Sequence, residues 1–165
     1  MPSILIAGLG KAAELAASEA DERNARCERF NRNLLSGLAP LEPILNGDPD
    51  ASVPQIINLS IPGVDSDSFI EATREVIAVS NGAACTTASP LCSHVLEAMQ
   101  VDADRAASAI RFSWHHETRE PDWAAVVAAV RRLQGEIARI VTNGKHSQRQ
   151  PTLAKHEVAG ERHAT

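Results

Sequence analysis

Aromatic residues are scarce in this sequence. Phe, Trp and Tyr make up 3% of the 165 residues, and Tyr is absent. Proteins that bind single-stranded nucleic acid usually stack the bases on aromatic side chains, so this composition disfavours that class. The formal net charge of −5, with 21 acidic and 16 basic residues, also disfavours binding to a phosphate backbone. We therefore expect no direct nucleic-acid partner.

Cysteines and long apolar segments are also few. The three cysteines, Cys27, Cys85 and Cys92, are an odd number without the spacing of a disulfide framework, and this usage fits a reducing compartment. No apolar run approaches the roughly 20 residues that a membrane-spanning helix needs, and no signal peptide is visible. The sequence therefore predicts a soluble cytoplasmic domain with no membrane partner.

Apolar periodicity predicts a long helix at each end of the chain. The first helix is expected over residues 1–38, with Gly37 as its C′ stop. Its expected apolar stripe comprises Leu9, Ala12, Ala13, Ala16, Ala20, Cys27, Phe30 and Leu34. The second helix is expected to begin at a Thr118 cap, with Pro121 in its first turn. Its expected buried residues are Trp123, Val126, Val127, Val130, Leu133, Ile137 and Ile140.

Shorter elements are expected between these helices. The expected strands are Ile44–Leu45, Gln55–Ile61, Val76–Val79 and Ser108–Trp114. Short helices are expected after a cap at Ser66 or Asp67, after Ser93 and over Asp102–Ala107. The fold class is α/β (α+β): a two-layer domain at residues 39–141, with about three strands in a mixed or antiparallel sheet covered by helices. Residues 142–165 are polar and aperiodic, and we expect a disordered tail.

The segment Gly8-Leu9-Gly10-Lys11 superficially suggests a phosphate-binding loop. It has neither the G-x-x-x-x-G-K-[ST] nor the G-x-G-x-x-G spacing, and no clear strand precedes it. We therefore interpret it as part of the first helix. Cys27 lies on the apolar stripe of the same helix, where we expect a buried structural thiol.

Cys85 lies in a segment of small residues, SNGAACTTAS, between an expected strand and an expected helix. No bulky side chain adjoins it in sequence, so the segment suits a thiol that must reach its target. Thiols in such loops serve nucleophilic or sulfur-carrying chemistry. The alternative is a loop cysteine without a role, and position alone does not separate the two.

Arg111 lies within the expected strand SAIRFSW. An arginine with apolar strand neighbours is costly to bury without a partner. Its guanidinium is therefore expected to face either a cleft that receives an anion or an internal carboxylate. The second alternative is a structural ion pair.

Cysteines and histidines near this segment suggest a metal site at first sight. Cys85, Cys92, His94, His115 and His116 are the candidates. The arrangement Cys-x6-Cys-x-His matches none of the tight zinc spacings. We therefore expect no metal ligands in this chain.

The segment SNGAACTTAS resembles the active-site loop of the cysteine desulfurases, S-S-G-S-A-C-T-S-A-S and its variants. SHVLEAM and SAIRFSW resemble the segments that follow that loop in the family. The resemblance runs from about Leu5 to about Val141. It implies the C-terminal small domain of a fold-type I enzyme that depends on pyridoxal phosphate, with GLGKAAELA in the helix that links the large and small domains.

The resemblance also implies roles for two residues. Cys85 would be the catalytic thiol that takes sulfur from L-cysteine as a persulfide, releasing L-alanine. Arg111 would be the substrate-binding residue that holds the α-carboxylate of L-cysteine. Lys11, Lys145 and Lys155 match no cofactor-lysine motif, so no cofactor-binding residue is expected here, and the pyridoxal phosphate would be bound by a missing large domain.

The chain alone is therefore expected to be inactive. It would be a truncated gene product or half of a split enzyme, with a large-domain chain or a second copy as partner. The sulfur acceptor would be a protein of iron–sulfur cluster assembly, tRNA thiolation or DNA modification. The alternative is a stand-alone persulfide carrier without catalysis of its own. Cys92 is then either incidental or able to resolve a Cys85 persulfide into a disulfide.

Overall fold

The computed structural model describes residues 2–81 and 93–147, with side chains up to residue 142. It divides into two units, 1–134 and 135–165, whose boundary falls inside the last helix; the fold described below is that of the first unit. The helices are α1 (Ser3–Leu38), α2 (Ser66–Thr73), α3 (His94–Ala98), α4 (Ala103–Ala107) and α5 (Trp123–Ser147), and short 3₁₀ turns occupy Ala39–Leu41 and Pro49–Ala51. The strands are β1 (Ile44–Leu45), β2 (Ile56–Ser60), β3 (Ser80–Asn81) and β4 (Ala109–Ser113).

The strands of the described residues form one sheet in the order β1-β2-β4-β3, and every pair is antiparallel. The longest pairing joins β2 to β4 over their full lengths, from Ile56 opposite Ser113 to Ser60 opposite Ala109. This confirms the predicted α+β class with long terminal helices. Four strands lie in the described part of the chain, whereas about three were expected.

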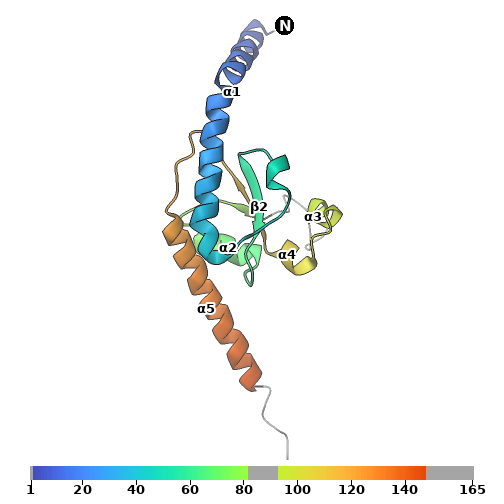
Figure 1. Ribbon diagram of the computed structural model, residues 1–165, viewed down its shortest axis with the longest axis vertical. Coiled ribbons are helices and arrows are strands. Elements are labelled where there is room, and N and C mark those ends of the chain that lie inside the picture. The colour runs from blue at the N-terminus through green and yellow to red at the C-terminus, as the bar shows by residue number, and fades with distance from the viewer. Residues whose placement is uncertain (1, 82–92, 148–165) are drawn as a thin grey trace, which may run out of the picture. The chain divides into compact units, whose positions relative to one another are not determined.

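One face of the sheet carries the core. Strand side chains alternate between faces, so Leu59, Ile110 and Phe112 share a face and are at most 4% exposed. They pack in one cluster with buried residues of α1, α2 and the first turns of α5. Figure 1 shows the C-terminal part of α1 lying along the sheet. The helices from opposite ends of the chain thus share one apolar layer with the strands.

Three aromatic rings join the two long helices to the sheet. Phe30 of α1 stacks on Trp114, just beyond β4, with ring centroids 5.0 Å apart. The rings of Phe30 and Trp123, which is in α5, pack edge to face with their centroids 5.9 Å apart. The Trp114 indole N–H donates to the carbonyl oxygen of Cys27 at 3.1 Å. Such pairs add to burial through their ring geometry, so the scarce aromatic residues are concentrated where the elements meet.

The starts of two helices and the role of Gly37 differ from the predictions. Helix α2 is capped by Asp65, whose carboxylate accepts the Ser68 N–H at 2.9 Å; the Ser68 hydrogen bonds hold the pKa of Asp65 below its usual value. Helix α5 begins after Asp122, which accepts the Ala125 N–H, and not at Thr118. Gly37 does not end α1. It lies inside the helix, where Trp123 packs so closely that no side chain fits.

The predicted strand Val76–Val79 is wrong. The N–H groups of Val76 and Ile77 donate to the Thr73 carbonyl oxygen at 2.8 and 3.0 Å. These bonds close a turn after α2 and remove the donors that a ladder would use. Pairing with β4 begins only at Ser80. Ile77 and Val79 are still partly buried against the core, which explains why the run is apolar.

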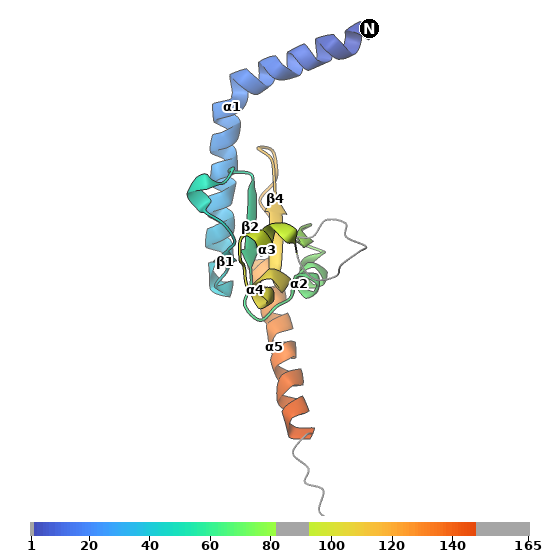
Figure 2. The same ribbon diagram turned by 90° about the vertical axis from the view of Figure 1, so that its right-hand side faces the viewer.

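The predicted apolar stripes are buried only in part. In α1, Cys27, Phe30 and Leu34 are buried, whereas Leu9 is 73% exposed. Figures 1 and 2 show the N-terminal turns of α1 extending beyond the sheet. In α5, Ile140 is 71% exposed, and the helix continues to Ser147 where a tail was expected from residue 142.

Within residues 2–81 and 93–147, no helix combines the length and the apolar character needed to span a bilayer.

The close approach of Gly37 to Trp123 can be tested by Gly37→Ala. A Cβ at this position would lie 2.5 Å from Trp123 Cγ and 2.6 Å from its Cβ. We expect a loss of about 1–3 kcal/mol in the free energy of unfolding, because overpacking outweighs the better helix propensity of alanine. Gly10→Ala in the same helix meets no atom within 4 Å and should be neutral or stabilising by up to about 1 kcal/mol. Urea unfolding followed by circular dichroism compares them, and equal stabilities would contradict the packing.

Cys27 provides a pH-dependent test. Burial raises the pKa of the Cys27 thiol above its ordinary value of 9.0, so ionisation is easier in the unfolded chain. Below that ordinary value both states hold the proton, and the thiol adds no pH dependence. Above it, the folded state should lose stability. The free energy of unfolding, measured by urea between pH 7 and 10.5, should fall more steeply for wild type than for Cys27→Ala. Parallel profiles would contradict a buried thiol.

Candidate functional site

Arg111 occupies the middle of β4, a strand with neighbours on both sides. It pairs with Asn58 of β2 on one side and with Ser80 of β3 on the other. Its neighbours in sequence, Ile110 and Phe112, face the core, so the Arg111 side chain lies on the opposite face. Arg111, Asn58 and Ser80 are all partly buried. They form a polar row across the face that the core does not use.

The Arg111 guanidinium has no acidic partner among the described residues. The ion pairs there involve Lys11, Arg23, Arg26, Arg32 and Arg74. No side-chain hydrogen bond from Arg111 occurs in the same part of the chain. The structural ion pair considered from sequence is therefore not formed within the described residues, and the guanidinium retains its capacity to bind an anion.

Cys85 and Cys92 lie outside the described residues. The described chain reaches Asn81, which pairs with Ile110 at the end of β3. Cys85 follows Asn81 by four residues. The segment with the thiol therefore leaves the sheet from the strand that is hydrogen-bonded to the Arg111 strand. The far end of the segment meets α3, whose N-cap position is Ser93, as predicted.

A hydrogen-bond network that sequence reasoning missed adjoins Arg111. The Asn46 side-chain amide donates to Asn58 Oδ1 at 2.7 Å and to Ser60 Oγ at 2.8 Å. Arg105 of α4 donates through Nε to Asn46 Oδ1 at 2.7 Å. The network thus ties the loop after β1, strand β2 and helix α4 together. Its signal in the sequence is the pair of polar residues at alternating positions of the strand, Asn58 and Ser60.

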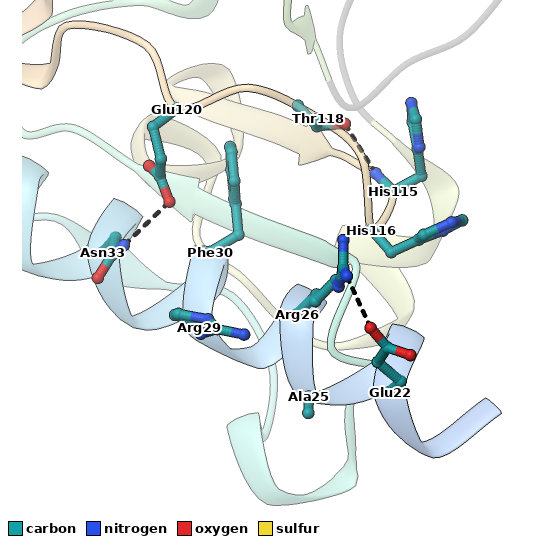
Figure 3. Close-up of a pocket in the computed structure, with 10 residues that line it drawn as sticks. All are labelled: Glu22, Ala25, Arg26, Arg29, Phe30, Asn33, His115, His116, Thr118 and Glu120. Atoms are coloured by element: carbon teal, nitrogen blue, oxygen red, sulfur yellow. Dashed lines mark hydrogen bonds and ion pairs between the residues drawn. The ribbon is translucent and has the colours of Figure 1, made fainter. Parts of the chain in front are cut away.

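Figure 3 shows a separate cavity between α1 and the loop after β4. Its volume is about 560 Å³, and its lining includes Arg29 and His116. Several of its polar groups are paired: Arg26 with Glu22 at 2.6 Å, Asn33 with Glu120 at 2.9 Å. Within the described residues, His94, His115 and His116 join no cluster of three or more metal-ligating side chains. These charged and polar groups of the lining are thus already used by pairs within the cavity.

Pyridoxal phosphate needs a lysine to hold it covalently, and the described residues do not fit that need. Lys11 lies on the exposed part of α1 and pairs with Glu14 at 2.9 Å. No sheet or core element surrounds it. What the described face supplies is hydrogen-bond donors beside the origin of the thiol segment. This arrangement is suited to holding a small anion.

Comparisons with known proteins place this geometry among its relatives. No protein-family model matches the chain. A cysteine desulfurase from Pongo abelii is 37% identical over 124 residues, which are 74% of this chain and 27% of that protein. The cysteine desulfurase IscS from Enterobacter sp. (strain 638) is 36% identical over 138 residues, 83% of this chain and 34% of that protein.

Solved structures give the same picture. The NifS-like protein from Rickettsia africae matches with a TM-score of 0.60 and 26% identity, over 81% of this chain and 34% of that one. DndA from Streptomyces lividans matches with a TM-score of 0.51 and 33% identity, over 70% of this chain and 32% of that one. The chain spans about one third of the length of the relatives it matches. It is homologous to the cysteine desulfurases and NifS-like proteins over about four fifths of its own length, as a domain-sized part of them.

Proposed function

We propose that this chain contributes the sulfur-accepting thiol and the substrate-carboxylate grip of a cysteine desulfurase. The observation that supports this most directly is the pairing of Ser80 with Arg111. It puts the strand that leads to Cys85 beside the strand that carries the guanidinium. The four residues from Asn81 to Cys85 span at most roughly 14 Å. The thiol therefore stays tethered near the guanidinium.

Arg111 would hold the α-carboxylate of L-cysteine. A guanidinium donates two parallel N–H bonds to a carboxylate, which sets both the position and the orientation of the substrate. Arg111 has no competing carboxylate within the described residues, and its side chain is partly exposed. The carboxylate of an amino acid matches this site in charge and in geometry.

Cys85 would receive the sulfur. As a thiolate, it is a strong nucleophile toward sulfur, and the resulting persulfide would be passed to an acceptor protein. The cofactor chemistry that releases sulfur from L-cysteine belongs to a large domain with pyridoxal phosphate. That domain corresponds to the two thirds of the relatives that this chain does not match.

A second candidate is a persulfide carrier that accepts sulfur from another enzyme. The absence of a fitting lysine within the described residues favours this reading. The two functions differ in their need for Arg111, because a carrier has no reason to bind an amino-acid carboxylate. The acceptor in either case would be a protein of iron–sulfur, tRNA or DNA sulfur metabolism.

Reconstitution separates the two functions. The chain is combined with a separately expressed large domain of a homologous desulfurase and pyridoxal phosphate, and alanine release from L-cysteine is measured. We expect no turnover from the chain alone, turnover from the pair, loss with Cys85→Ser, and near wild-type turnover with Cys92→Ser. Arg111→Lys should lower kcat/KM about tenfold to a hundredfold, since an ammonium cannot make the two-pronged contact.

Arg132→Lys on the exposed side of α5 is the matched control and should leave kcat/KM unchanged. Wild-type kcat/KM in Arg111→Lys would remove the substrate-binding role. If Cys85 still accepts a persulfide from an added desulfurase in that case, the carrier function is the correct one.

A further inference from the structure

Asn58 stands beside Arg111 in the polar row of the sheet. The two residues are direct partners in the β2–β4 ladder. On its other side, the Asn58 carbonyl oxygen accepts the Asn46 backbone N–H at 2.9 Å, which extends the β1–β2 pairing by one position. Asn46, Asn58, Arg111 and Ser80 therefore follow one another across four adjacent backbone segments. Facing side chains in such a row lie about 4.5–5.5 Å apart at Cβ.

The orientation of the Asn58 amide is determined by Arg105. A guanidinium only donates hydrogen bonds, so the Asn46 atom that faces Arg105 Nε must be its oxygen. The Asn46 nitrogen is then directed at β2, where it donates to Asn58 and Ser60. The Asn58 atom facing Asn46 must in turn be its oxygen, because the Asn46 nitrogen needs an acceptor. One donor-only group thus sets the polarity of two amides in succession.

Arg105 is itself firmly held. Its guanidinium also donates to the Leu45 carbonyl oxygen. Its own carbonyl oxygen accepts the Ser60 hydroxyl at 2.7 Å and the Ser108 hydroxyl at 3.0 Å. The side-chain end of Arg105 is thus joined to Leu45 and Asn46, and its backbone end to Ser60 of β2. These bonds hold the guanidinium in place and fix the orientation of the Asn46 amide.

The remaining Asn58 group is the nitrogen Nδ2, since the amide oxygen faces Asn46. Strands β1 and β4 flank β2 on opposite sides, so an amide whose oxygen is on the β1 side can present Nδ2 on the side of Arg111. Within the described residues, neither Asn58 Nδ2 nor the Arg111 guanidinium donates to a protein acceptor. The two groups cannot bond to each other, because both are donors. An acceptor that satisfies both must come from outside the described residues, and a carboxylate has enough lone pairs for a two-pronged arginine bond and one amide bond together.

We propose that Asn58 is a second donor to the substrate carboxylate beside Arg111, and that Arg105, acting through Asn46, is a positioning residue that keeps the Asn58 nitrogen turned toward that carboxylate. The inference rests on the proposed function for the identity of the anion. The donor pair and its orientation rest on the hydrogen bonds alone.

The first experiment is a titration of the full ¹⁵N-labelled chain with sodium propionate, a carboxylate without thiol or amine, at constant ionic strength. We expect the Arg111 Nε–H and Asn58 Nδ2 resonances to shift along one saturation curve. Propionamide, which has the same shape without the charge, should shift neither. The Asn33 side-chain amide, which donates to Glu120, is the internal control and should not move.

Two variants measure what Asn58 contributes. Asn58→Ala should weaken propionate binding about tenfold, the usual effect of losing one hydrogen bond to a charged group. Asn33→Ala, the same substitution on α1, should leave the affinity unchanged. If propionate shifts Arg111 alone and Asn58→Ala binds as wild type does, this inference is overturned and the proposed function of Arg111 still stands.

The orientation of the Asn58 amide can be measured separately by nuclear Overhauser contacts. In the wild-type chain, nuclear Overhauser contacts should join the Asn58 Nδ2 protons to the Arg111 side chain, and contacts to the Asn46 side-chain protons should be weaker. Arg105→Met keeps bulk and removes the donors, so it should equalise these contacts and lower propionate affinity to that of Asn58→Ala. Arg105→Lys keeps a donor and should retain most of the affinity. If the strongest Overhauser contacts of the Asn58 Nδ2 protons in wild type are to Asn46, the positioning role of Arg105 is overturned. This outcome does not require Arg105→Met to fold.

The reconstituted assay distinguishes the two proposals. If propionate shifts both residues while Arg111→Lys keeps wild-type turnover of L-cysteine, the anion site exists but L-cysteine is not its ligand, and the substrate assignment is overturned. If neither residue responds to propionate, the donor pair is overturned, while loss of turnover in Arg111→Lys would still support Arg111.

Discussion

The antiparallel pairing of β2 with β4 is the constraint on which the rest of the structure depends. The register sets Asn58 against Arg111 and, one position away, Leu59 against Ile110. Because side chains alternate along each strand, one residue of slippage would move the apolar set to solvent and the guanidinium into the core. The burial of Leu59 and Ile110 therefore specifies the position of Arg111. The packing of the core and the polar row on the opposite face both follow from this one register.

The apolar side of that pairing brings together helices far apart in sequence. Phe30 contacts both Trp114 and Trp123, and Gly37 allows Trp123 to approach the helix backbone. Few aromatic residues are present, and these three lie at the junction of α1, β4 and α5. The N-terminal turns of α1 lack such contacts within the described residues, which is why Leu9 stays exposed although it belongs to the same periodic stripe.

The polar side of the pairing is organised by hydrogen bonds that run in one direction. Arg105 donates to Asn46, and Asn46 donates to Asn58, so the amide nitrogen of Asn58 is the group left without a partner among the described residues. Desulfurase chemistry would add a thiol and a cofactor to this face. The chain has the thiol in its sequence, whereas its described residues offer no lysine in a setting that fits the cofactor. The homology covers about one third of the length of cysteine desulfurases. This agrees with a thiol in this chain and a cofactor site in the part of the relatives that it does not match.

The sequence by itself determined the class of fold, most strands, the burial of Cys27 and the homology, because periodicity and local motifs depend on neighbours a few residues apart. It pointed to Arg111 through the apolar neighbours of that residue. It did not determine that the Val76–Val79 run closes a turn, that Gly37 serves Trp123, or that Ile140 remains exposed. The turn competes with strand pairing through the nearby Thr73 carbonyl oxygen, whereas the role of Gly37 depends on Trp123, which is distant in the chain. The orientation of Asn58 was likewise decided only by tertiary structure, since Arg105 reaches it across 47 residues of sequence through hydrogen bonds that no local pattern records.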